Sequence, residues 1–130
     1  MKTIINNVIS ILATYFIYLV GGIDVAFISL VVIMALDYIT GVLSAIYNKK
    51  LNSKIGYKGI LKKASYLLVI ALGVILDKLL GQTGSVRTLI IYFFVANDGI
   101  SILENVGEMN IPLPKKLKEL LDQLKKDGDE

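Results

Sequence analysis

The length of the apolar segments constrains this chain more than any other feature of its sequence. Residues 23–47 contain only two charged side chains, Asp24 and Asp37. At about 1.5 Å per residue, a helix of this length exceeds the roughly 30 Å hydrocarbon thickness of a bilayer. Hydrophobic residues make up 55% of the 130-residue chain, and a soluble domain of this size leaves too much surface exposed to bury them. The sequence therefore predicts an integral membrane protein.

We expect an all-α fold with about four transmembrane helices, followed by an amphipathic cytoplasmic helix at the C-terminus, in an oligomer. The transmembrane domain is predicted at residues 1–111 and the tail at 112–130. The expected spans are residues 4–20, 23–47, 60–80 and 88–106. Two alternatives stay open for these segments. The first span has the basic start and apolar run of a signal peptide, and the polar residues of the fourth are compatible with a helix lying in the membrane interface.

A lysine-rich connector between the second and third spans determines the expected orientation. It contains no acidic residue, and its lysines are Lys49, Lys50, Lys54, Lys58, Lys62 and Lys63. Short connectors rich in lysine and arginine remain in the cytoplasm. With lysines also at position 2 and after the fourth span, the rule places both termini in the cytoplasm. We interpret the connector lysines as determinants of topology that also contact anionic lipids.

The residue types argue against several function classes. The chain has no cysteine and no histidine, so disulfides, thiolate chemistry and nucleophiles paired with histidine are excluded. We expect no enzyme activity, no cofactor and no metal site. The net charge of +3 does not indicate nucleic-acid binding, because the lysines flank apolar segments and do not alternate with stacking aromatic residues.

Asp37 is the most unusual residue of the second span, since an aspartate at the centre of a membrane helix costs about 2.5–3.5 kcal/mol on insertion scales. It either lines water or responds to the energised membrane, or it is held by neighbouring hydroxyls or a lysine in an ordinary helix contact. Gly41, Ser44 and Ala45 share its helical face. Small residues allow another helix to approach closely, so this face packs either against another subunit or within the chain.

The fourth span carries a polar stripe at three- and four-residue intervals. Its members are Asn97, Asp98, Ser101, Glu104, Asn105 and Glu108. A helix facing only lipid would not carry these residues. We predict that the stripe lines a pore, and the alternatives are polar packing between helices or an amphipathic helix at the cytoplasmic surface.

Three blocks of the sequence resemble the toxin-secretion and phage-lysis holins of Gram-positive bacteria and their phages. The first runs from DYITGVLSAI at 37–46 through the lysine-rich connector. The second is NDGISILEN at 97–105, which has Asp98 where the family pattern has glutamate. The third is IPLPKKLKELL at 111–121, similar to the Pro-x-Pro-basic opening of the family's tail. Together the blocks cover about half of the chain.

The resemblance implies a protein that oligomerises in the cytoplasmic membrane and opens timed lesions. Such lesions release an endolysin, or in some relatives a toxin, without necessary direct contact between the two proteins. Its partners would be further copies of itself and anionic lipids. The competing interpretations are a small four-span proton-coupled transporter and a membrane anchor or scaffold.

Overall fold

The computed structural model of the chain describes residues 1–129, and these form a helical structure without strands. The helices are α1 (Lys2–Val20), α2 (Val25–Tyr47), α3 (Ser53–Leu79), α4 (Ser85–Gly107) and α5 (Lys115–Asp129). Four of them contain stretches long and apolar enough to cross a membrane, namely Lys2–Val20, Val25–Tyr47, Gly56–Leu79 and Ser85–Gly107. The predicted all-α fold class with four membrane helices and a final helix is confirmed.

Local sequence signals set several helix ends. Helix α1 ends at Gly21, whose φ of 83° lies in the left-handed region that glycine adopts without strain. Asp24 caps the start of α2, where its Oδ1 accepts a hydrogen bond from the backbone N–H of Phe27 at 3.0 Å. Pro112 and Pro114 lie in the connector that precedes α5. The predicted turns therefore coincide with identifiable capping and breaking residues.

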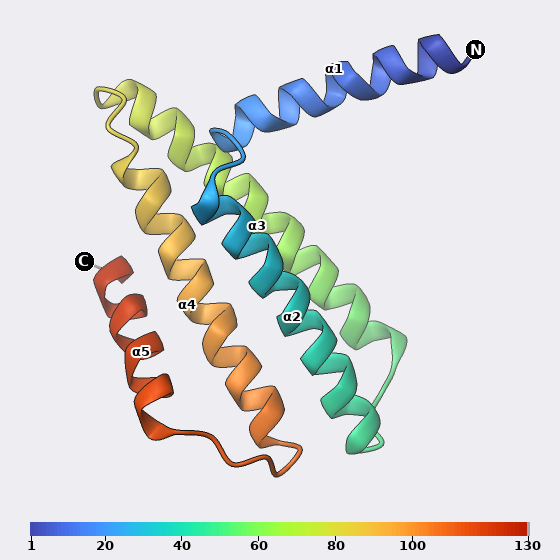
Figure 1. Cartoon of the computed structure of the whole chain (residues 1–130), viewed down its shortest axis with the longest axis vertical. Coiled ribbons are helices and arrows are strands. Elements are labelled where there is room, and N and C mark those ends of the chain that lie inside the picture. The colour runs from blue at the N-terminus through green and yellow to red at the C-terminus, as the bar shows by residue number, and fades with distance from the viewer. Residues whose placement is uncertain (130) are drawn as a thin grey trace.

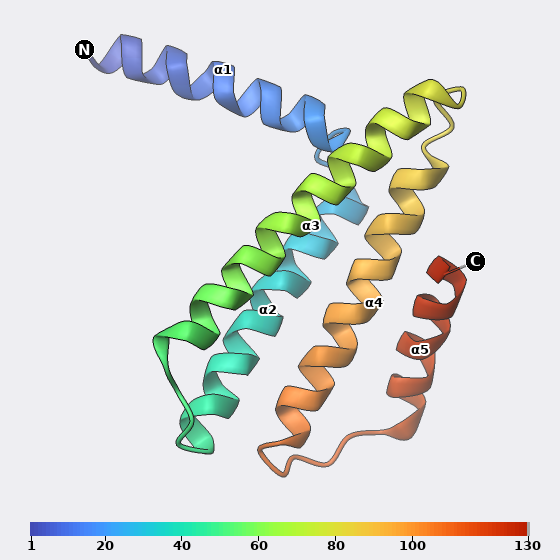
Figure 2. The ribbon, with the colours of Figure 1, turned by 180° about the vertical axis from the view of Figure 1, so that it is seen from behind.

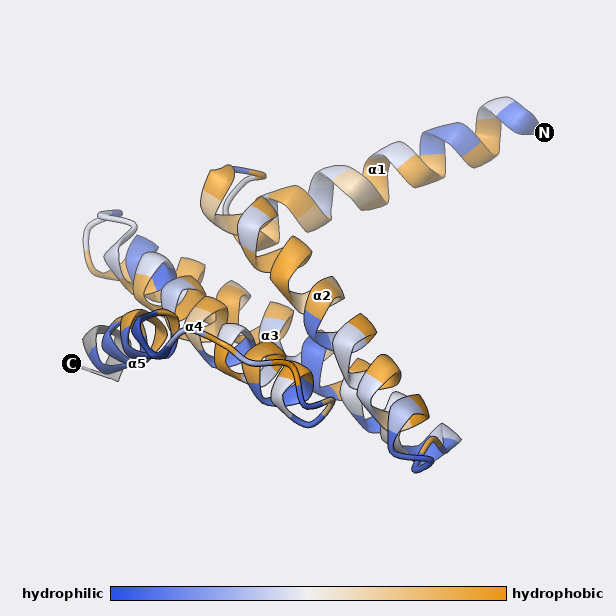
Figure 3. Cartoon of the chain, turned by 60° about the horizontal axis from the view of Figure 1, so that its bottom comes forward, coloured by the Kyte–Doolittle hydropathy of each residue, from blue (hydrophilic) through white to orange (hydrophobic). Residues whose placement is uncertain are grey.

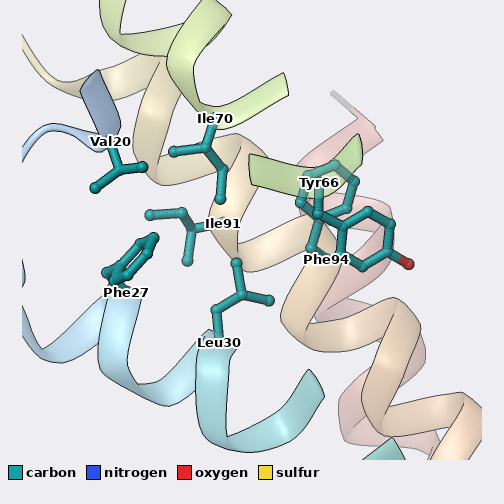
Figure 4. Close-up of a cluster of buried hydrophobic side chains, with 7 residues drawn as sticks. All are labelled: Val20, Phe27, Leu30, Tyr66, Ile70, Ile91 and Phe94. Atoms are coloured by element: carbon teal, nitrogen blue, oxygen red, sulfur yellow. The ribbon is translucent and has the colours of Figure 1, made fainter. Parts of the chain in front are cut away.

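Helices α2, α3 and α4 form a bundle in which α4 contacts both of the others, whereas α2 and α3 have little contact with each other. Figures 1 and 2 show the three helices running along one direction, with the α2–α3 and α4–α5 connectors at the same end. Figure 4 shows the apolar core, which includes Val20 and Phe27 on either side of the α1–α2 turn. It comprises Val20, Phe27, Leu30, Tyr66, Ile70, Ile91 and Phe94.

Helix α1 leaves the bundle instead of packing along it. It projects away from the end opposite the lysine-rich connector (Figures 1 and 2). Val20 is its buried residue, and Phe16 makes an edge-to-face contact with Phe27 at 6.2 Å between ring centroids. The ribbon of α1 is largely hydrophobic (Figure 3). Its apolar surface is thus left for contacts outside the folded chain.

Helix α5 packs against α4 and runs back along it from the connector (Figures 1 and 2). One side of the tail carries a leucine face, formed by Leu113, Leu117, Leu120, Leu121 and Leu124. Of these, Leu121 lies over Gly99, where an added Cβ would be 3.0 Å from Leu121 Cδ2. The opposite face of α5 is hydrophilic (Figure 3). Leu121 thus packs on α4, whereas Leu117, Leu120 and Leu124 of the same face stay exposed, and whether the tail lies in the cytoplasm stays a prediction.

Helix α3 begins earlier than the expected third span. We placed the span at 60–80 and assigned the lysines before it to a connector, but the helix starts at Ser53. Lys54, Lys58 and Lys62 therefore lie on helix α3, and the connector is confined to residues 48–52. No proline interrupts residues 53–63, and lysine is a good helix former, so the helix continues beyond its apolar part.

Candidate functional site

The centre of the bundle contains a lysine between two aspartates from neighbouring helices. Lys63 of α3 places its Nζ 2.8 Å from Asp37 Oδ2 on α2 and 3.0 Å from Asp98 Oδ2 on α4. The side chains of Lys63 and Asp37 are 16% and 15% exposed, and that of Asp98 is 1% exposed. Asp37 is the thirteenth of 23 residues in α2. We name Asp37, Lys63 and Asp98 the central triad.

Tyr66 and Asn97 extend the central triad toward the apolar core. The Tyr66 hydroxyl donates to Asp98 Oδ1 at 2.8 Å and accepts from Asn97 Nδ2 at 2.9 Å. The ring of Tyr66 stacks on Phe94 with centroids 3.9 Å apart and an interplanar angle of 4°. Lys63 and Tyr66 are three residues apart on α3 and therefore share one helical face. Asp98 thus has a partner for each carboxylate oxygen.

Asn105 and Glu108 join α4 to α2 on the connector side of the triad. Asn105 Nδ2 lies 3.0 Å from Thr40 Oγ1, 3.2 Å from the Asp37 carbonyl and 3.3 Å from Asp37 Oδ1. One turn further along, the Ser44 hydroxyl donates to Glu108 Oε2 at 2.8 Å. These bonds complete a polar seam between α2, α3 and α4.

The charges of the central triad do not cancel if all three groups are ionised, because two carboxylates face one ammonium. In a low-dielectric interior such a group is stable only when its charged atoms are paired and hydrogen-bonded. Among the described residues, every buried side-chain nitrogen and oxygen has a hydrogen-bond partner. No group of three or more potential metal-ligating carboxylates occurs in that part of the chain. The arrangement can hold three membrane helices together, and it can change their packing if its pairing changes.

A second charged cluster lies at the opposite end of the bundle, where Arg87 holds the α1–α2 turn. Its Nε donates to the Val20 carbonyl at 2.6 Å and its Nη2 to the Gly22 carbonyl at 3.0 Å. Its Nη1 lies 2.8 Å from Asp24 Oδ2. The guanidinium holds the pKa of the Asp24 carboxyl below its usual range. We name this cluster the turn clamp.

Asp77 completes the turn clamp from α3. Its two carboxylate oxygens accept hydrogen bonds from the backbone N–H groups of Val86 and Arg87, at 2.9 and 3.0 Å. These are unpaired donors at the start of α4, where a negative charge is favoured. The carboxylate therefore fixes the first turn of α4 beside the end of α3.

The structure divides the predicted polar stripe of α4. Asn97, Asp98 and Asn105 are bonded to α2 or α3, as described above, whereas Glu104 is exposed and Ser101 lines a cavity. The stripe therefore packs largely within the chain, which is one of the alternatives considered for it. A role of these residues in lining a pore stays a prediction.

The small-residue face of α2 also lies against α4. Ser44 is 2% exposed, and a Cβ added at Gly41 would be 3.6 Å from Asn105 Nδ2. Ala45 lines the cavities beside these residues. Intrachain packing accounts for Gly41 and Ser44, and an oligomer contact by this face stays a prediction.

Lys63 requires a correction. We assigned it, with the other connector lysines, to topology and lipid contact, but its ammonium is directed into the bundle. The physical reason is that Asp37 and Asp98 would otherwise be buried without a cation. Lys49, Lys50, Lys54, Lys58 and Lys62 are exposed, and their predicted contact with lipid is untested.

Tyr66 and Arg87 were not identified from the sequence as site residues. In the sequence, Tyr66 looks like any other aromatic residue of an apolar segment. It does lie one helical turn after Lys63, and this spacing could have identified it as a neighbour of that lysine. Arg87 is the single arginine of the chain, and we counted it only as a charge in a turn. Its guanidinium binds backbone carbonyls of the α1–α2 turn, and no sequence pattern specifies such a contact.

Comparison of the sequence with known proteins identifies a family and several relatives. Residues 14–126 match the model of the bacteriophage holin family. An uncharacterized 14.9 kDa protein in the nagH 3′ region of Clostridium perfringens is 45% identical over 95% of this chain and 97% of its own length. The uncharacterized Lmo0128 of Listeria monocytogenes is 40% identical, over 80% of this chain and 74% of that protein. The uncharacterized YtkC of Bacillus subtilis is 31% identical, over 81% and 78%. No solved structure matches.

Proposed function

The chain belongs to the bacteriophage holin family, and from this premise we propose that it oligomerises in the bacterial cytoplasmic membrane and opens timed lesions. Through these lesions an endolysin, or a toxin, leaves the cell. The family is one of non-enzymatic membrane proteins. The observation that carries the proposal is the central triad, which places charged groups in the middle of otherwise apolar helices.

The triad supports a closed form and an open form of the same helices. In the described structure its charges are paired within one chain. Lining a water-filled lesion would require the polar faces of α2 and α4 to exchange these partners for water. Water solvates such groups well, whereas lipid does not. Exposure of the triad is therefore coupled to the formation of an aqueous space between subunits.

Expression in a bacterium, with and without a cytoplasmic endolysin, tests the proposal. We expect an abrupt loss of membrane potential at a characteristic time, followed by lysis only in cells that contain the endolysin. Normal growth at high expression would contradict a lesion-forming role. Flux of a specific solute that saturates, without lysis, would indicate a proton-coupled transporter instead, for which a buried carboxylate is also suited.

Asp37→Asn tests whether the triad controls the timing. This change removes one carboxylate and weakens the attachment of α2 to α3, so we expect earlier loss of potential at matched protein levels. Asp122→Asn on the exposed face of α5 removes the same charge elsewhere and is the control. Equal timing of Asp37→Asn and the unmodified protein would return Asp37 to a purely structural role.

The proposed orientation is tested by single cysteines in this cysteine-free chain. Ser53→Cys should be protected from an impermeant thiol reagent in intact cells, and Thr83→Cys should react. The opposite pattern would reverse the assignment of the lysine-rich end to the cytoplasm.

A further inference from the structure

Helix α5 lies beside α4 without covering its own apolar side. Leu121 contacts Gly99, and Lys125 places its Nζ 5.9 Å from the centre of the Phe93 ring. The other leucines of the helical part of the leucine face, Leu117, Leu120 and Leu124, remain 41%, 53% and 39% exposed. Only one edge of the leucine face is therefore turned toward α4, and its centre stays uncovered.

The position of α5 along α4 does not suit a lipid environment. Gly99 and Phe93 lie about 12 and 21 Å from the end of α4 at Gly107, at about 1.5 Å per residue. With α4 crossing a hydrocarbon core about 30 Å thick, the docked α5 would reach the middle of the bilayer with its charged side chains outward. Charged side chains are costly at that depth unless they face protein or water. In a bilayer, α5 therefore has to leave α4 or meet an aqueous space beside it.

The charges of α5 follow a definite order around the leucine face. At 3.6 residues per turn, Lys116 lies at one border of this face, and Lys118 and Lys125 lie at the other. Glu119 and Asp122 fall on the opposite side of the helix, where both are exposed. Lysines at such borders extend toward headgroups while the leucines between them enter the acyl region. The helix thus matches a surface of anionic lipid, with its acidic residues turned toward water.

The connector before α5 lets the helix reach such a surface. Residues 108–114 join it to α4 at the lysine-rich end of the bundle (Figure 1), and an extended chain spans about 3.3–3.6 Å per residue. Lys49 and Lys50 at the same end are exposed, and lysines close to a membrane surface attract anionic headgroups. The bundle and α5 therefore present positive charge to the same surface.

We propose that α5 leaves α4 and lies flat on the anionic membrane surface at the lysine-rich end, with its leucine face in the acyl region. The two positions exclude each other, because α4 crosses the membrane whereas an interfacial helix lies in its plane. A tail-to-tail contact between copies fits less well, since the lysines that border one leucine face would repel those of another. The proposal does not depend on lesion formation.

Single labelled cysteines in the full-length, otherwise cysteine-free protein test this position. Leu124→Cys, near the centre of the leucine face, and Asp122→Cys, on the opposite side, each carry an environment-sensitive NBD label. In vesicles of phosphatidylcholine and phosphatidylglycerol, lipids brominated in the acyl chain should quench position 124 about threefold more than position 122. Leu120→Cys repeats the measurement at a second, more exposed leucine. Equal quenching on the two sides of the helix would show that α5 is not inserted by its leucine face and would overturn the proposal.

Removing negative charge from the vesicles tests the lipid class. In pure phosphatidylcholine, quenching at position 124 should fall about threefold. Changing Lys116, Lys118 and Lys125 together to glutamine should cause the same fall with phosphatidylglycerol present. The matched control, glutamine at Lys54, Lys58 and Lys62 of α3, should leave the quenching unaltered. Quenching that is insensitive to phosphatidylglycerol, or equally sensitive to both triple variants, would contradict recognition of anionic lipid by α5.

Oxidative cross-linking separates the two other positions of α5. If the labels at 120 and 124 stay in water in every vesicle and Leu120→Cys forms no disulfide between copies, α5 remains docked on α4. If oxidation converts Leu120→Cys into a covalent dimer and lipid quenching is absent, the leucine face joins copies of the chain. Either result overturns the proposal.

Discussion

The central triad and the turn clamp use similar charges in different surroundings. The triad joins side chains of three helices near the middle of their length, and its Asp98 is 1% exposed. The turn clamp lies at the helix ends, binds two backbone carbonyls, and includes an Asp24 side chain that is 52% exposed. Water therefore reaches Asp24 at the clamp but not Asp98 at the triad, although Arg87 and Asp77 of the clamp are themselves buried. The clamp is therefore suited to fix the junction between α1 and α2. The triad is suited to resist rearrangement of the helices until water solvates its charged groups.

Removing Lys63 should have the largest effect on stability. Lys63→Met leaves the buried Asp98 and the half-buried Asp37 without their cation and should cost about 3–5 kcal/mol of unfolding free energy. Lys62→Met, at the adjacent exposed position, should change it by less than about 0.5 kcal/mol. Denaturant titrations in micelles, followed by circular dichroism, measure both. Similar losses for the two variants would remove the distinction between a buried and an exposed lysine on which the comparison depends.

Arg87→Gln should have a smaller effect at the turn clamp. It removes the ion pair with Asp24 and the donors to the Val20 and Gly22 carbonyls, the first of which is buried, so a loss of about 1–3 kcal/mol is expected. Lys2→Gln, which removes one positive charge from exposed α1, is the control in the same titration. A loss for Arg87→Gln larger than that for Lys63→Met would reverse the ranking of the two clusters.

Tyr66→Phe tests a single hydrogen bond at the edge of the triad. The ring can still stack on Phe94, but Asp98 Oδ1 loses its donor, and a cost of about 1–2 kcal/mol is expected. Tyr92→Phe removes a hydroxyl from an exposed tyrosine and should be neutral. Thermal unfolding of the two variants measures the difference, and equal melting temperatures would mean that the hydroxyl does not support the triad.

Acidification should give the smallest effect, through Asp24. Its pKa is lowered by Arg87, so its contribution is fully present above the unfolded value of about 3.9 and is lost as pH falls through the folded value. The exposed side chain limits this contribution to a surface-pair magnitude. Stability measured below about pH 4 should therefore fall less steeply in Asp24→Asn than in the unmodified protein. Parallel curves would indicate that the clamp is held by its backbone bonds alone.

Much of the candidate site could be predicted as a set of residues but not as a set of contacts. Asp37 and Asp98 stand out in sequence because a carboxylate inside an apolar segment is costly. Their partner does not stand out, since Lys63 is one of six lysines in the same stretch. Helical spacing alone gives no reason to separate Lys63 from Lys62. Their roles differ because one position of α3 faces α2 and α4 and the next does not.

The sequence by itself determined the membrane-spanning character of the chain, the positions of the turns other than the α2–α3 connector, and the family. These depend on local quantities, namely the length of apolar runs, the distribution of lysines and the residues that end helices. Only the tertiary structure decided which charges pair, that the polar stripe of α4 is divided, and that α4 covers only one edge of the leucine face of α5. Such features depend on the rotation of each helix against its neighbours, which many side chains set together.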